Sequence, residues 1–126
     1  TQHMPAFFIT ALASRIGRET GRECREPVAG TPIEPGKIYL APGDRHLLVE
    51  RKGSSWVAVL SDGPAENFCR PAVDPMFRSL AKAFGKDLVA VVLTGMGEDG
   101  KEGSREVVSA GGTVIAQDEA SSVVWG

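Results

Sequence analysis

The chain has 126 residues, a length that suits one domain rather than two. Its 14 Lys and Arg residues are outnumbered by 16 Asp and Glu residues, which gives a net charge of −2. Without a basic excess, we expect no binding to nucleic acid or to an anionic membrane surface. No apolar run approaches the roughly 20 residues that a membrane-spanning helix needs, so we also expect no membrane insertion.

The first half of the sequence predicts one helix followed by three strands. Pro5 suits the first turn of a helix, and Gly17 or Gly21 suits its end. The apolar stripe that would face the core consists of Phe8, Leu12 and Ile16. The polar, Pro- and Gly-rich stretch that follows is interpreted as loop. An antiparallel meander is then predicted from three short strands, at residues 37–41, 46–50 and 56–60.

The second half predicts a helix and then a βαβ unit. Asp74 offers a capping carboxylate just before Pro75 at the first helical position, and Gly85 ends the helix. The apolar run at residues 88–94 is typical of a strand buried on both faces of a parallel sheet. A short helix at residues 102–110 and a second buried strand at residues 113–116 complete the unit. The fold class is therefore α/β, with an added antiparallel hairpin.

A glycine-rich loop follows the first strand of the βαβ unit. Gly95, Gly97 and Gly100 match the G-x-G-x-x-G pattern of dinucleotide-binding folds. Asp118 lies just past the next strand, where a ribose-binding carboxylate would stand. With Lys101, the loop also comes close to a phosphate-binding loop. A dinucleotide- or phosphate-binding α/β module that uses this loop is therefore one alternative.

The charges of the same loop disfavour a nucleotide. Glu98 and Asp99 would lie against a pyrophosphate that is already negative. In a phosphate-binding loop, the position after Lys101 should be Ser or Thr to hold Mg²⁺, and here it is Glu102.

A catalytic interpretation of the loop rests on Asp99 and a histidine. Active sites of open α/β sheets gather at the carboxyl ends of strands, and a carboxylate there can orient and stabilise an imidazole. His3 is the candidate partner, whereas His46 is interpreted as a surface or hairpin-packing residue. The structural alternative is that Asp99 only caps the helix beginning near Gly100, with His3 on the surface. No serine lies in a tight strand-to-helix elbow, so we identify no nucleophile in the chain.

The two cysteines, Cys24 and Cys69, lie far apart, and neither has a second Cys or a His nearby at zinc-finger spacing. We interpret them as reduced thiols of a cytoplasmic protein and expect no metal site.

Several segments together resemble the catalytic domain of chemotaxis protein-glutamate methylesterases, the CheB family. They lie in family order at residues 1–5, 38–47, 67–74, 93–100 and 116–121. The resemblance implies a doubly wound α/β domain with a mostly parallel sheet and no cofactor. It implies hydrolysis of glutamate methyl esters on chemoreceptors in bacterial chemotaxis adaptation, with release of methanol, and in some members deamidation of receptor glutamines.

The resemblance also implies roles for individual residues. His3 of the Gln-His-Met segment matches the general base, and Asp99 of the Gly-Met-Gly-x-Asp-Gly loop matches the residue that orients it. The backbone N–H of Met96 matches an oxyanion-hole donor. Asn67 and Arg70 match a loop that flanks the site.

In the family, the nucleophilic serine lies in a Gly-rich segment upstream of the Gln-His-Met motif. We therefore expect residues 1–126 to be part of a single catalytic domain, lacking the nucleophile segment and the C-terminal end, and expect the isolated chain to be inactive. The expected partners are the methylated cytoplasmic domains of chemoreceptors and, in the complete protein, a receiver domain. A catalytically inactive homologue that binds signalling partners is a further alternative.

Overall fold

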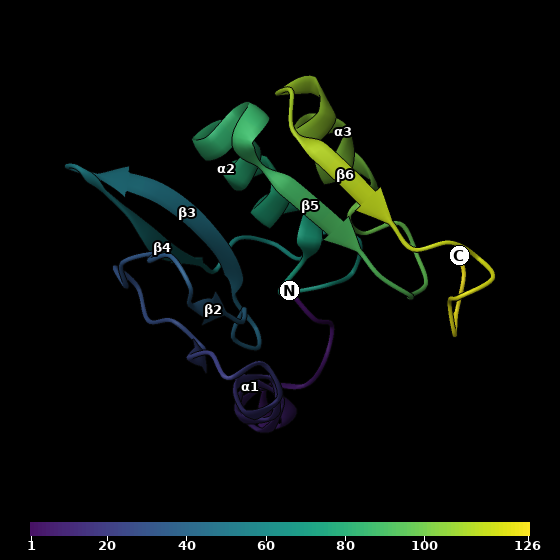
Figure 1. Ribbon diagram of the computed structural model, residues 1–126, viewed down its shortest axis with the longest axis horizontal. Coiled ribbons are helices and arrows are strands. Elements are labelled where there is room, and N and C mark those ends of the chain that lie inside the picture. The colour runs from purple at the N-terminus through teal and green to yellow at the C-terminus, as the bar shows by residue number, and fades with distance from the viewer.

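Short strands and three helices make up the computed structural model, which describes residues 1–126 (Figure 1). In chain order the elements are α1 (Ala6–Thr20), β1 (Cys24–Arg25), β2 (Ile38–Tyr39), β3 (His46–Lys52), β4 (Ser55–Ser61), α2 (Val73–Phe84), the short 3₁₀ helix η1 (Gly85–Asp87), β5 (Val89–Val92), α3 (Lys101–Ser109) and β6 (Thr113–Ala116). No helix is long and apolar enough to cross a bilayer.

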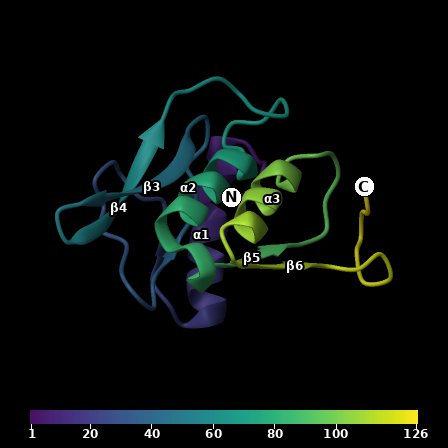
Figure 2. The ribbon, with the colours of Figure 1, turned by 90° about the horizontal axis from the view of Figure 1, so that it is seen from above.

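The predicted βαβ unit is confirmed. Strands β5 and β6 are parallel neighbours, in register from Val89 opposite Thr113 to Val92 opposite Ala116, and α3 connects them. Figure 2 shows α2 and α3 together on one face of this strand pair. The largest core cluster lies between these helices and the strands, and it consists of Phe77, Ala81, Ala90 and Val107.

The prediction that these two strands are buried on both faces is wrong for this chain. Val89, Val91 and Ile115 are 59%, 52% and 54% exposed, because the helices α2 and α3 cover only the opposite face. The apolar run at residues 88–94 therefore packs one face against the helices and leaves the other open.

The predicted meander is also wrong, because β2 does not pair with β3. Strand β2 pairs in parallel with β1, and β1 lies in the Pro- and Gly-rich stretch that was interpreted as loop. Only β3 and β4 form an antiparallel hairpin, from His46 opposite Ser61 to Lys52 opposite Ser55. The other side of β4 is taken by the Pro- and Gly-rich stretch, where Pro32 bridges to Val57. Backbone hydrogen bonds can pair segments that have no strand-like side-chain pattern, which is why the sequence did not show them.

Helix α1 ends at Gly21, one of its two predicted ends, and Gly17 lies inside it; its buried face only partly matches the predicted stripe. Ile9 and Ala13 are buried against Leu40, whereas Phe8 is 51% exposed. Leu12 of the predicted stripe packs against this cluster and Ile16 is half-buried, so the prediction is wrong for Phe8 and incomplete without Ile9 and Ala13. Gly21 ends the helix with a φ of 65°, the left-handed conformation that glycine adopts without strain.

Candidate active site

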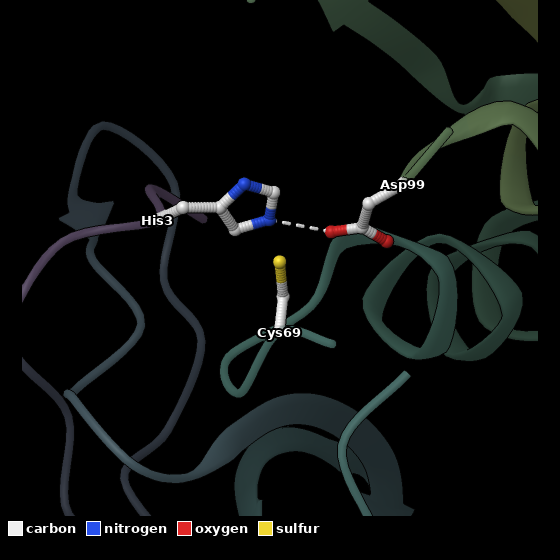
Figure 3. Close-up of side chains that lie close together, drawn as sticks. All are labelled: His3, Cys69 and Asp99. Carbon is white, nitrogen blue, oxygen red and sulfur yellow. Dashed lines mark hydrogen bonds and ion pairs between the residues drawn. The ribbon is translucent and has the colours of Figure 1, made fainter. Parts of the chain in front are cut away.

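His3 and Asp99 meet although 96 residues separate them. Figure 3 shows the imidazole and the carboxylate facing each other, and the distance from His3 Nε2 to Asp99 Oδ2 is 2.6 Å. His3 belongs to the segment before α1, and Asp99 to the loop between β5 and α3. The imidazole is 38% exposed and the carboxylate only 4%. The carboxylate of Asp99 is thus shielded from solvent, whereas the His3 ring that it binds is accessible. The predicted contact between the two residues is confirmed.

Backbone amides hold the Asp99 carboxylate in place. Oδ2 accepts a hydrogen bond of 2.6 Å from the N–H of Val73, and Oδ1 accepts one of 3.0 Å from the N–H of Asp74. Burial acts to raise the pKa of Asp99, but these two amides, His3 and Asn67 together hold the pKa below its ordinary value. An ionised carboxylate can only accept, so the neutral His3 ring donates from Nε2 and leaves Nδ1 as a bare acceptor.

The structural alternative, in which Asp99 only caps the helix that follows it, is therefore wrong. Asp99 binds the first amides of α2, a helix that precedes it in the chain. The N-terminus of α3 is capped instead by Asp74, whose Oδ1 accepts from the N–H of Gly100 at 3.1 Å and of Gly103 at 2.6 Å. Asp74 was expected to cap α2, but it lies inside the first turn of that helix, after Ala72. Its side chain instead binds the N-terminus of α3, which packs against α2.

Asn67 lies at the site rather than only beside it. Its Nδ2 donates to Asp74 Oδ2 at 2.8 Å and to Asp99 Oδ1 at 3.3 Å. One amide group thus bridges the two carboxylates and offsets the repulsion between them.

Two side chains fix the loop that carries Asn67. His46 is 3% exposed and accepts at Nδ1 from the N–H of Ala72, while its Nε2 donates to the carbonyl of Pro64. Of the two positions expected for His46, the surface position is wrong and the packed position in the hairpin is confirmed. Arg70 donates to two backbone carbonyls near the start of the same loop. The guanidinium thus stabilises the loop, and Arg70 lines a small cavity together with His3 and Cys69.

A cavity of about 400 Å³ opens beside the pair. His3 and Asp99 line it together with the segment Gly95–Gly97. The N–H of Gly95 donates to the carbonyl of Val124, whereas the N–H of Met96 makes no hydrogen bond within the chain. Met96 and His3 line the same cavity, so this N–H is free to donate to a group bound there, as an oxyanion-hole donor must.

Cys69 lies next to the His3–Asp99 pair, and the sequence pattern indicated no role for it beyond that of a reduced thiol. Figure 3 shows its sulfur pointing toward the Nε2 edge of the His3 ring. A ring nitrogen of His3, the sulfur of Cys69 and a carboxylate oxygen of Asp99 all lie within 4.8 Å of one another. Burial, and to a lesser degree the charge of Asp99, raise the pKa of the Cys69 thiol. The thiol is thus not activated as a nucleophile, but the three side chains could hold a metal ion.

The structure disfavours a phosphate at the glycine-rich loop. The amides of Gly100 and Gly103, which a phosphate at the start of α3 would use, are already bound by the buried carboxylate of Asp74. Lys101 is paired with Glu98 at 2.9 Å.

The structure also disfavours the ribose-binding role considered for Asp118. Its carboxylate accepts hydrogen bonds from the backbone and hydroxyl of Ser121, which lower its pKa. The carboxylate is thus engaged within its own turn.

Fold and site together define an α/β protein with a hydrolase-like histidine–aspartate pair at the carboxyl end of a parallel strand. The chain belongs to the CheB methylesterase family, whose model matches residues 1–126.

Known proteins similar to this chain agree with the family. The chain is 61% identical to a protein-glutamate methylesterase/protein-glutamine glutaminase of Paramagnetospirillum magneticum and 58% identical to one of Azospirillum brasilense. Both matches cover all of this chain but only 33% and 32% of those proteins, so the chain spans about a third of their length. The crystal structure of the Thermotoga maritima CheB methylesterase catalytic domain superposes with a TM-score of 0.95 at 38% identity, covering 99% of this chain and 66% of that one. The α/β fold class is thereby confirmed.

Proposed function

We propose that this chain supplies the base and oxyanion-hole part of a cytoplasmic protein-glutamate methylesterase. The substrates are glutamate methyl esters on chemoreceptor cytoplasmic domains, and the same site deamidates receptor glutamines. The observation that carries the proposal is the hydrogen bond of 2.6 Å between His3 and a shielded, ionised Asp99, beside the cavity that the Gly95–Gly97 segment lines. The residues supply two of the three groups of a serine-hydrolase mechanism.

In the proposed mechanism, a serine hydroxyl from outside these residues attacks the ester carbonyl. Nδ1 of His3 takes the hydroxyl proton, and Asp99 stabilises the resulting imidazolium. The N–H of Met96 donates to the oxyanion of the tetrahedral intermediate, which is worth about 3–4 kcal/mol in comparable sites. Nδ1 then returns the proton to the departing methoxide, so methanol leaves an acyl-enzyme. Water, deprotonated by the same nitrogen, then attacks the acyl-enzyme. Nδ1 returns this proton to the departing serine oxygen, so glutamate is released and the serine hydroxyl is restored.

The experiment that tests this proposal is a chimera. Residues 1–126 replace the matching segment of the Paramagnetospirillum magneticum relative, to which they are 61% identical. We expect the chimera to release methanol from methylated receptor, and the 126-residue chain alone to release none. A well-folded chimera without activity would contradict the proposal and favour the inactive homologue.

Point variants of the chimera separate the roles of the two site residues. Asp99→Asn should lower kcat about 10⁴-fold, because the imidazole loses its oriented tautomer and counter-charge. His3→Gln removes the base and should lower kcat at least as much. Glu98→Gln, at the exposed position next to Asp99, is the matched control and should stay within about twofold of the unmodified chimera, as expected of an exposed substitution.

A further inference from the structure

Three metal-binding side chains of different chemistry gather at one place in this chain. His3, Cys69 and Asp99 come from the segment before α1, the loop before α2 and the loop before α3. No other group of three His, Cys, Asp or Glu side chains in the chain lies close enough to share an ion. The sulfur and the carboxylate oxygen both approach the ring from its Nε2 side (Figure 3).

We propose that His3, Cys69 and Asp99 form a binding site for a thiolate-preferring divalent ion, of which Zn²⁺ is the chief candidate, and that the ion holds the histidine in an inactive form. Imidazole, thiolate and carboxylate are the three ligand types that Zn²⁺ takes in proteins. Three protein ligands and one water make the four-coordinate arrangement of an open zinc site. Hard ions such as Mg²⁺ prefer oxygen ligands and should be rejected.

The geometry needs only small movements. At normal bond lengths, the ligand atoms of a tetrahedral zinc site lie about 3.3–3.6 Å apart. The three donor atoms already lie within 4.8 Å of one another, and the hydrogen bond of 2.6 Å between His3 and Asp99 has to open by less than an ångström or so. Asp99 is held by two backbone amides, so the more exposed His3 ring is the part that moves.

An ion can reach the site from solvent. A cavity of about 280 Å³ lies on the side of His3 that faces the loop before α2, and His3, Cys69 and Arg70 are among the residues that line it. Arg70 donates to backbone carbonyls there and so is not directed at the proposed ligands. One thiolate and one carboxylate neutralise the charge of the ion.

Binding of the ion would disable the proposed base. When the metal takes Nε2, the ring proton moves from Nε2 to Nδ1, and the thiol proton leaves to solvent. Nδ1 then carries a proton and cannot accept one from a nucleophile. This consequence rests on the proposed esterase function, whereas the binding of the ion does not.

The test uses the 126-residue chain and Co²⁺ as a spectroscopic stand-in for Zn²⁺. We expect one Co²⁺ per chain, with the thiolate-to-metal charge-transfer band that reports sulfur coordination, and we expect Zn²⁺ to displace it. Cys69→Ser should abolish the band. Cys24→Ser is the matched control, since it removes the only other thiol and should leave the band intact. His3→Gln should weaken binding at least about tenfold.

Three outcomes would overturn the proposal. They are the absence of a thiolate band in the unmodified chain, a band that persists in Cys69→Ser, and a band that is lost equally in Cys24→Ser. Should Cys69→Ser fold poorly, the ring resonances of His3 in the Cys24→Ser variant provide a second measurement. Zn²⁺ should shift them at one equivalent, and unshifted resonances would contradict the site.

The chimera links the site to activity and separates the two proposals. Zn²⁺ should inhibit methanol release in proportion to the occupancy of the site. Each protein's rate is expressed relative to its own metal-free rate. The Zn²⁺ concentration that gives half-inhibition should then be at least about tenfold higher in Cys69→Ser than in the unmodified chimera. If the isolated chain binds Co²⁺ through Cys69 and the chimera is inactive, the ion site stands and the esterase proposal fails. If the chimera is active and insensitive to Zn²⁺, the inactivation by the ion is wrong.

Discussion

Asp74 and Asp99 cap each other's helices. Asp99 accepts from the first amides of α2, which contains Asp74, and Asp74 accepts from the first amides of α3, which begins two residues after Asp99. The carboxylate that binds His3 is thus also part of the hydrogen-bonded contact between α2 and α3. Weakening this contact between the two helices should therefore disturb the site and the fold together.

Removal of the buried cap at Asp74 should destabilise the chain. Asp74→Ala leaves the amides of Gly100 and Gly103 without acceptors, and each buried unpaired donor costs about 1–3 kcal/mol. We expect the free energy of unfolding to fall by about 2–4 kcal/mol in urea titrations. Asp87→Ala, at an exposed position with no side-chain hydrogen bond, is the control and should change it by less than about 0.5 kcal/mol. Equal effects of the two variants would show that the cap contributes nothing.

Gly103 should not tolerate a methyl group. A Cβ there would lie 2.7 Å from Phe77 Cβ and 3.0 Å from the Asp74 Cα, where α3 crosses α2. Although alanine favours helix by about 1 kcal/mol over glycine, we expect Gly103→Ala to destabilise by about 1–3 kcal/mol through overpacking. Ser109→Ala, on the exposed side of the same helix, should be neutral in the same thermal unfolding experiment. A Gly103→Ala variant more stable than the parent chain would mean that the two helices can separate freely.

Acid should weaken the chain through Asp99. Its pKa is lower in the folded chain than the value of about 3.9 expected when unfolded. The stability that its hydrogen bonds contribute is therefore complete above that pH and is lost as the pH falls through the folded pKa. We expect the difference in unfolding free energy between the parent chain and Asp99→Asn to be largest near neutral pH and to shrink below about pH 4. The measurement is urea unfolding at a series of pH values, and a difference independent of pH would contradict it.

The sequence predicted the parts of the fold and site that depend on local pattern. The apolar runs at residues 88–94 and 113–116 were sufficient to predict the parallel pairing of β5 and β6, and the resemblance placed His3 beside Asp99. The cap of α3 by Asp74 could not be predicted, because it joins residues 26 and 29 positions apart through helix packing.

The position of Cys69 was equally hidden from sequence pattern. It reaches the site through an irregular loop in which Asn67 and Phe68 both have positive φ angles. Such backbone turns at residues other than glycine leave no periodic signal in the sequence.

The most direct test of the account is the protonation of the neutral His3 ring, measured by long-range ¹H–¹⁵N correlation NMR on the 126-residue chain. We predict that the proton is on Nε2 and that Nδ1 is bare, because an ionised Asp99 accepts from Nε2. In Asp99→Asn, each oxygen position faces a backbone donor, since the N–H of Val73 approaches Oδ2 and the N–H of Asp74 approaches Oδ1. A neutral carboxamide has only one oxygen and cannot satisfy both donors and His3, so it no longer fixes the ring proton.

The His3 ring should therefore populate both neutral tautomers in that variant. His46 should keep its proton on Nε2 in both proteins, since the N–H of Ala72 donates to its Nδ1. Two results would contradict the claim that Asp99 orients His3 as a base: a His3 proton on Nδ1 in the parent chain, or a single tautomer that is as fixed in Asp99→Asn as in the parent chain.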